Sequence, residues 1–172
     1  MESLIQPDKL AIMEHKFEFV YELLDSIDKL SIDDQSLLEK AKEATKTAYA
    51  PYSNFYVGAA AKLSNGQIVI GSNQESTSFP VGICAERALL NCIGSQFPGL
   101  TISAIAVSYQ PRDKASIEPI SPCGMCRQSL LDYENRFGHA IKIILSGMTG
   151  QVMVIPSAAN LLPFGFDGSI LK

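Results

Sequence analysis

Two short cysteine motifs constrain this chain more than any other feature of its sequence. The first is Cys84-Ala85-Glu86-Arg87, and the second, between positions 121 and 128, contains Cys123 and Cys126. Together they offer three thiolates and one nearby carboxylate. This is the set expected around a zinc ion that keeps one coordination position open and has a proton carrier beside it. A purely structural zinc site needs a fourth protein ligand, which this spacing does not supply.

The composition indicates one ordinary globular domain. The chain has 172 residues, of which 47% are hydrophobic and 19% charged, enough for a sizeable core. The net charge of −4 and the lack of a Lys/Arg cluster argue against a polynucleotide partner. The start lacks the pattern of a signal peptide, and the apolar runs are too short to span a membrane. We therefore expect a cytoplasmic protein, in which grouped cysteines bind metal rather than form disulfides.

The chain divides into an N-terminal extension, residues 1–32, and a domain formed by residues 33–172. The extension is rich in acids and lysine and has no glycine, and we expect it to pack on the domain. Its run Phe17-Glu18-Phe19-Val20-Tyr21 has an ambiguous period.

The domain's pattern predicts a three-layer α/β/α fold, with one mixed five-stranded sheet and helices on both faces. Ser31 is a good N-cap for a helix to about Tyr49, and Asn65-Gly66 is a hairpin signal. Further helices are expected from near Gly82, from Cys123, and over a short stretch to Leu162. The five strands are expected at about 56–63, 67–71, 102–108, 140–145 and 151–155.

The cysteine spacing favours helix N-termini as the metal-binding elements. Cys123 and Cys126 are one helical turn apart, and Cys84 lies near the start of another helix. The helix dipole stabilises thiolates at such positions. Cys92 lies about 12 Å further along its helix than Cys84 and is expected to be a small buried hydrophobe. His15 and His139 have no ligand spacing, although a closed four-ligand site would need one of these three residues.

Glu86 and Arg87 complete the expected site. Three thiolates around Zn²⁺ leave a net charge of −1, so we expect Arg87 to compensate by hydrogen bonding to cysteine sulfur. Glu86 can point into the open position and carry a proton. The alternative for Glu86 is an acid favoured at this position only by the helix dipole, and the alternative for Arg87 is an ordinary surface arginine. A redox Cys-x-x-Cys pair is a further alternative, but it leaves Cys84 and Glu86 unexplained.

These motifs, with others, make the chain similar to the cytidine deaminase family, in its short, three-cysteine, tetrameric branch. The resemblance spans most of the chain and implies one zinc ion per subunit. It rests on four blocks, at residues 48–60, 71–75, 84–87 and 121–128, and residues 161–164 also look like the family's C-terminal Leu-Leu-Pro segment.

The resemblance implies a substrate site for a small nucleoside. Asn73 and Glu75 would hold the ribose hydroxyl, and Phe55 would pack on the pyrimidine. The backbone N–H of Ala85 would bind the 2-oxo group, and the carbonyl of Ser121 would accept the leaving amino group. Turn formation by Asn73 and core packing by Phe55 remain alternative readings.

The implied activity is hydrolytic deamination of cytidine and 2′-deoxycytidine to uridine and 2′-deoxyuridine, with release of ammonia, in pyrimidine salvage. Glu86 would take a proton from water and return it to the substrate. The branch forms homotetramers in which aromatic residues complete neighbouring pockets; Phe164 and Phe166 are candidates, unless they pack in the core. Ser76-Thr77-Ser78-Phe79 stands where the family usually has Asn-Ala-Ser-Tyr, which affects the expected sugar selectivity.

Three other functions remain open. A blasticidin-S-type deaminase shares the zinc blocks, but Asn73, Glu75 and Arg87 argue against it. A polynucleotide-editing deaminase is disfavoured by the acidic charge. A non-catalytic, zinc-stabilised binding module would have a closed metal shell and no role for Glu86.

Overall fold

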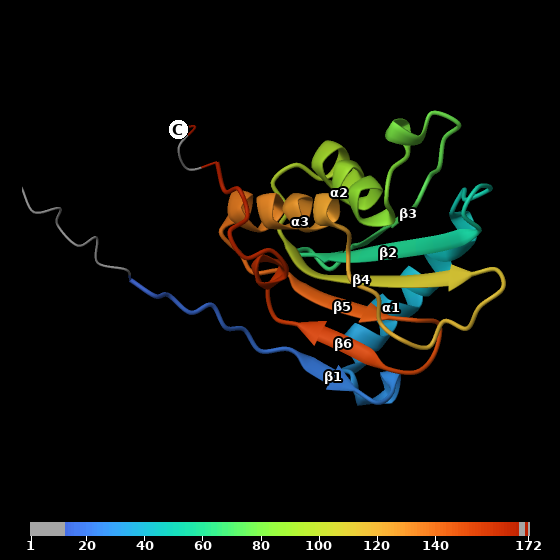
Figure 1. Ribbon diagram of the computed structural model, residues 1–172, viewed down its shortest axis with the longest axis horizontal. Coiled ribbons are helices and arrows are strands. Elements are labelled where there is room, and N and C mark those ends of the chain that lie inside the picture. The colour runs from blue at the N-terminus through green and yellow to red at the C-terminus, as the bar shows by residue number, and fades with distance from the viewer. Residues whose placement is uncertain (1–12, 169–170, 172) are drawn as a thin grey trace, which may run out of the picture.

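The computed structural model describes residues 13–168 and 171, which form a single mixed sheet between two layers of helices (Figure 1). The sheet order is β1-β6-β5-β4-β2-β3; β4 and β5 are parallel, and the other neighbours are antiparallel. The strands are β1 Glu22–Leu24, β2 Phe55–Leu63, β3 Ile68–Ser72, β4 Ile102–Pro111, β5 Lys142–Ser146 and β6 Val152–Ile155. The α-helices are α1 Ile32–Ala44, α2 Ala85–Gln96 and α3 Gly124–Phe137, and short 3₁₀ turns include η3 Phe79–Val81 and η4 Ala158–Leu161.

The three-layer architecture is confirmed, and the strand number is corrected from five to six. The additional strand, β1, pairs Leu23 with Met153 of β6 at the edge of the sheet. Three residues are too few to show a hydrophobic period, so this strand depends on its partner rather than on its own sequence. Residues 1–12 of the expected extension lie outside the described residues.

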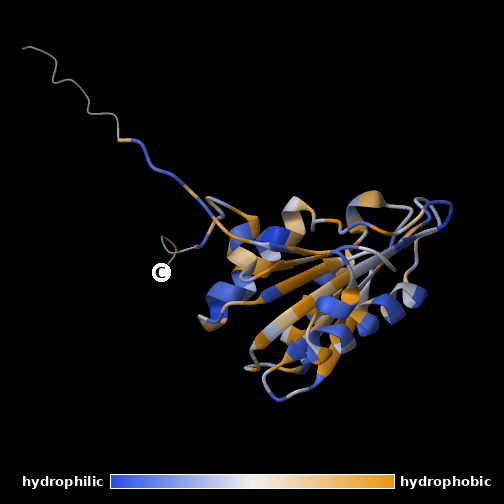
Figure 2. Ribbon diagram, turned by 90° about the horizontal axis from the view of Figure 1, so that it is seen from below, coloured by the Kyte–Doolittle hydropathy of each residue, from blue (hydrophilic) through white to orange (hydrophobic). Residues whose placement is uncertain are grey.

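The helices take opposite faces of the sheet because neighbouring strand residues alternate between two apolar clusters. Ala59 and Ala61 of β2 pack with the α2 and α3 side, whereas Ala60 packs with the α1 side. Hydrophobic residues accordingly fill the sheet, while the outward turns of the helices are hydrophilic (Figure 2). None of the helices in the described part of the chain is long and apolar enough to cross a membrane.

Close packing of α2 on β3 fixes where the first cysteine motif lies. A β-carbon on Gly71 of β3 would lie 2.7 Å from the carbonyl oxygen of Ala85 in α2. Only glycine permits this approach. The start of α2 is thereby held against the sheet, next to the segment that follows β3.

The N-cap predicted at Ser31 is confirmed, and its hydroxyl accepts a hydrogen bond from the backbone N–H of Asp34. The helix ends earlier than expected, at Ala44. The Thr45 and Thr47 hydroxyls then donate to the carbonyls of Lys42 and Ala44, within a short 3₁₀ turn. Such local side-chain bonds compete with continuation of an α-helix.

Candidate metal centre and substrate pocket

Three cysteine thiols meet where α2 and α3 begin. Cys84 is the N-cap of α2, Cys123 is the N-cap of α3, and Cys126 lies in the first turn of α3. The Cys84 and Cys123 sulfurs are 3.8 Å apart, the Cys123 and Cys126 sulfurs 3.5 Å, and all three lie within 4.8 Å of one another. Both helix N-termini therefore direct their positive dipole ends toward the same three sulfurs.

The donor set fits zinc. A tetrahedral zinc with Zn–S bonds of about 2.3 Å requires sulfurs about 3.8 Å apart, close to the 3.8 and 3.5 Å separations found. Among residues 13–168 and 171, no histidine, carboxylate or other cysteine joins this group. Three protein ligands leave a position for water or substrate, as in catalytic rather than structural zinc sites. Cys84, Cys123 and Cys126 thus form a cluster that could hold the metal.

The other three ligand candidates lie outside the cluster. Cys92 is half-buried against the main core on α2. His15 and His139 are exposed. Neither a closed four-ligand site nor a simple two-cysteine redox pair describes this arrangement.

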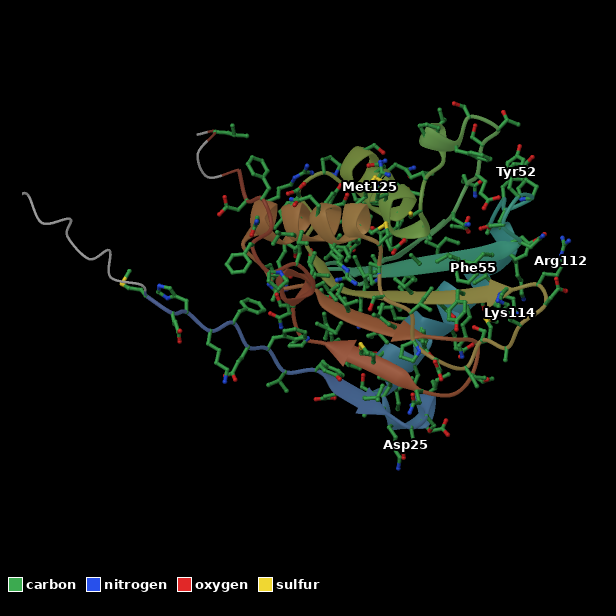
Figure 3. All side chains as sticks on the ribbon, viewed as in Figure 1. Asp25, Tyr52, Phe55, Arg112, Lys114 and Met125 are labelled. Atoms are coloured by element: carbon green, nitrogen blue, oxygen red, sulfur yellow. The ribbon has the colours of Figure 1, made fainter. Side chains whose placement is uncertain are left out.

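The thiols of Cys84 and Cys126 differ in pKa. The hydrogen bond with Cys126 lowers the pKa of Cys84 to about 6, and the Arg87 guanidinium contributes in the same direction. That same bond, with burial, raises the pKa of Cys126. Arg87 itself directs Nη1 to the Met125 sulfur at 3.9 Å, not to a cysteine sulfur as its sequence position suggested, so here it acts on the cluster through its charge. Met125 lies beside α2 at the start of α3 (Figure 3).

Glu86 is the buried carboxylate of the site. It lies in the first turn of α2, is only 5% exposed, and lines the same cavity as Cys84 and Cys123. Burial raises the pKa of Glu86 above its ordinary value. A carboxylate in this state can hold or release a proton nearer neutral pH than a solvated one.

A cavity of about 420 Å³ opens in front of the cluster, large enough for a small ligand. It collects every pocket residue expected from the resemblance, from four different parts of the chain. These are Phe55, Asn73, Glu75, Ala85 and Ser121.

Phe55 faces the cavity and also has a packing partner. Its ring stacks on Tyr109 with a centroid distance of 5.2 Å and an interplanar angle of 24°. Phe55 can therefore serve both as a packing residue and as a contact for the pyrimidine, because one ring face packs on Tyr109 and the residue also lines the cavity. Figure 3 shows Phe55 on β2, away from the N-terminal segment.

Hydrogen bonds to the segment around Phe55 hold Asn73 and Glu75 in the wall of the cavity. Asn73 accepts from the N–H of Val57 through Oδ1 and donates to the carbonyl of Phe55 through Nδ2. Glu75 accepts from the backbone N–H of Tyr52 and from both the N–H and the hydroxyl of Ser53. Desolvation opposes these hydrogen bonds, but they prevail and lower the pKa of Glu75.

Ser53 is a pocket residue that sequence reasoning did not single out. Its hydroxyl donates to Glu75 Oε1 at 2.5 Å and accepts from the N–H of Phe55. The residue lies inside the block at positions 48–60, and its contact with Glu75 joins that block to the block at 71–75. A hydrogen bond across 22 positions of sequence leaves no local signal.

Comparison with known proteins places this site in a family. Residues 31–137 match the family model described as the cytidine and deoxycytidylate deaminase zinc-binding region. The chain belongs to this deaminase family. Its relatives include a cytidine deaminase of Halalkalibacterium halodurans, 32% identical over 135 residues that cover 78% of this chain and 95% of that protein.

Solved deaminases share the fold as well. The crystal structure of cytidine deaminase from Burkholderia pseudomallei superposes with a TM-score of 0.65 at 39% identity, covering 76% of this chain and 97% of that one. That from Mycobacterium tuberculosis gives 0.60 at 30% identity, covering 79% and 98%. This chain is therefore a zinc-binding deaminase with the architecture of the bacterial enzymes.

The difference in pKa between Cys84 and Cys126 predicts how zinc uptake by this deaminase depends on pH. Because the pKa of Cys84 is lowered to about 6 and that of Cys126 is raised, we expect Cys84 to be mostly a thiolate at neutral pH and zinc binding to displace the proton of Cys126. As the pH falls through about 6, Cys84 also becomes protonated, and binding should release about one more proton per zinc and weaken. Calorimetry in buffers of different ionisation enthalpy measures this number. A constant proton release across that range would contradict the prediction.

Proposed function

We propose that this chain hydrolyses cytidine and 2′-deoxycytidine to uridine and 2′-deoxyuridine, releasing ammonia in pyrimidine salvage. The observation that carries the proposal is that Glu86 and the thiols of Cys84 and Cys123 line one cavity with Asn73 and Glu75. Zinc, when bound, lowers the pKa of water and so supplies a nucleophile at neutral pH.

Residues of the chain transfer the protons and bind and orient the substrate. Glu86, buried and with a raised pKa, takes one proton from the attacking water and delivers it to N3 of the base; it then takes the second proton from the hydroxyl added at C4 and gives it to the departing amine, so that ammonia leaves as the 4-oxo group forms. The backbone N–H of Ala85 binds the 2-oxo group, and the carbonyl of Ser121 accepts from the amino group. Phe55 orients the ring by packing on its face.

The sugar is proposed to bind between Asn73 and Glu75. After its two intramolecular bonds, Asn73 keeps one free N–H, and Glu75 Oε1 keeps acceptor capacity beyond the Ser53 hydroxyl. One donor and one acceptor are what a single hydroxyl needs. The rigid attachment of both side chains to β2 and to the Tyr52-Ser53 turn favours this pre-organised role.

Replacing Glu75 by glutamine should raise KM for cytidine with a smaller effect on kcat. The amide keeps the size of the side chain, but it places a donor or a weaker acceptor where the carboxylate accepts bonds from Ser53 and the sugar. We expect a loss of roughly ten-fold in kcat/KM, from one charged hydrogen bond. Steady-state kinetics measure it, and 3′-deoxycytidine, which lacks the hydroxyl, provides the control. Equal losses on both substrates would contradict the sugar role.

The assembly is proposed to be a homotetramer in the cytoplasm. Phe164 is fully exposed and Phe166 is 57% exposed, which favours their contacting a neighbouring subunit over core packing. Sedimentation equilibrium tests the stoichiometry, and a monomer that is fully active would contradict it.

The proposed reaction is tested by incubating zinc-loaded protein with cytidine and following ultraviolet absorbance and ammonia. Loss of the cytosine band with stoichiometric ammonia is the expected result. Blasticidin S in a parallel reaction separates the related aminonucleoside deaminases. Zinc binding without turnover of either compound would leave a non-catalytic zinc module and overturn the proposal.

A further inference from the structure

The segment before β1 forms an aromatic arm, defined here as residues 13–24. It runs extended to β1, which pairs with β6, and appears as the blue chain in Figure 1. The rings of Phe17, Phe19 and Tyr21 follow one another at centroid distances of 6.2 Å. In an extended chain, alternate residues share one side. The arm precedes residues 31–137, the part matched by the family model.

The arm contributes to the wall of a second cavity, of about 260 Å³. Phe19 and Tyr21 contribute to one part of its lining, and Arg127 and Leu161 to another. Ser121 lines both this cavity and the substrate pocket. The segment at Ser121 is therefore the wall that separates the two spaces.

Arg127 hydrogen-bonds this segment to the segment that contains Leu161. Its Nε donates to the carbonyl of Pro122 at 2.8 Å, and its Nη1 donates to the carbonyl of Leu161 at 3.1 Å. Pro122 directly precedes the metal-ligand candidate Cys123 and follows Ser121. One planar guanidinium thus fixes the peptide that leads into a thiolate, using the two-donor geometry that lysine cannot reproduce.

Phe19 and Tyr21 of the arm line the same cavity as Arg127. Phe19 and Tyr21 are 43% and 50% exposed, so about half of each residue is covered by the rest of the protein. Hydrogen bonds from a charged donor strengthen when water is excluded and the local dielectric falls. Removing the two rings would open the guanidinium to solvent and loosen its hold on Pro122.

We propose that the aromatic arm is a positioning element of the metal site: Phe19 and Tyr21 shield Arg127, which holds the Ser121–Cys123 segment in the geometry that zinc and the leaving amino group require. The part concerning the leaving group rests on the proposed function. The part concerning zinc rests on the thiol cluster and on these contacts alone.

The test uses the full-length, zinc-loaded protein with Phe19 and Tyr21 both replaced by serine. The matched control is Val20→Ser, because Val20 lies between them on the arm and is 79% exposed. Residues that support metal ligands from outside typically change affinity by roughly ten-fold or more, so the double variant should bind zinc several-fold more weakly in a chelator competition. Its cobalt-loaded form should also show a shifted thiolate-to-metal absorption band, whereas Val20→Ser should match the unmodified protein in both measurements.

A double-mutant cycle with Arg127→Lys separates positioning from general loss of stability. If the arm acts through Arg127, replacing Phe19 and Tyr21 should weaken zinc binding much less in the Arg127→Lys background. An unchanged effect in that background, or wild-type zinc affinity in the double arm variant, would overturn the proposal. Neither measurement requires deamination, so a failure of cytidine turnover in the unmodified protein would count against the proposed function only.

Discussion

Replacing Glu86 by glutamine is expected to abolish turnover of cytidine while leaving zinc in place. Glutamine matches the size of Glu86 and can hydrogen-bond, but it cannot accept and return a proton. General acid–base catalysis typically contributes about 10²- to 10⁴-fold, and this carboxylate is proposed to act at more than one step. We therefore expect kcat to fall by at least roughly 10³-fold, with zinc content by mass spectrometry near that of the unmodified protein.

The fold should not suffer from this substitution. Glu86 is 5% exposed, and burial raises its pKa, so the ionised form costs free energy in the folded protein. A raised pKa means that the folded state favours the protonated form, so the stability linked to Glu86 is present at low pH and is lost as the pH rises through the folded-state pKa. In metal-free protein, the free energy of unfolding of Glu86→Gln relative to the unmodified chain should therefore increase with pH.

Two controls make the result specific. Glu39→Gln alters an exposed carboxylate of α1, where it pairs with Lys42, and it should leave activity and zinc content unchanged. Urea unfolding at two pH values checks the sign of the stability change. Substantial turnover by Glu86→Gln would remove Glu86 from the chemistry, and loss of zinc would make it a support of the metal site instead.

The zinc cluster could be predicted because its signal is local. Cys123 and Cys126 are one turn apart at a helix start, and Cys84 starts another helix, so local helix geometry places each thiol at a helix N-terminus. The meeting of the two N-termini at one cluster depends on the fold. The buried position of Glu86 follows from the same helix. Close packing of α2 on Gly71 then brings this helix end to the sheet. The sequence shows that a glycine stands at this position, but it does not show which helix packs against it.

The features that escaped prediction depend on contacts between distant segments. Strand β1 exists because Met153 and its neighbours on β6 offer an open edge. The bond from Ser53 to Glu75 and that from Arg127 to Leu161 each join segments more than 20 positions apart. Arg87 was expected to donate to a cysteine sulfur, yet its bond goes to Met125, a neighbour that only the folded packing of α2 and α3 brings near.

Replacing Cys126 by serine is expected to remove both zinc and activity, and Cys92 offers a matched comparison in the same chain. Cys126 is fully buried, and its sulfur is 3.5 Å from that of Cys123. A serine hydroxyl at this position does not ionise at neutral pH, so the site is left with two thiolates, too few for a tightly bound zinc. Cys92 packs half-buried on the main core, outside the cluster, and its replacement should leave zinc content unchanged.

The two substitutions should also differ in how much they lower the free energy of unfolding. A metal present at about 1,000 times its dissociation constant stabilises the folded state by about 4 kcal/mol, and Cys126→Ser should lose most of this contribution. Cys92→Ser should cost about 1 kcal/mol, as an ordinary core substitution does. Thermal melts with and without chelator measure both: chelator should lower the Tm of Cys92→Ser as it does that of the unmodified protein, but it should hardly change that of Cys126→Ser. If Cys92→Ser lost zinc instead, the ligand set would include Cys92, and the open coordination position on which the proposed chemistry depends would no longer be available.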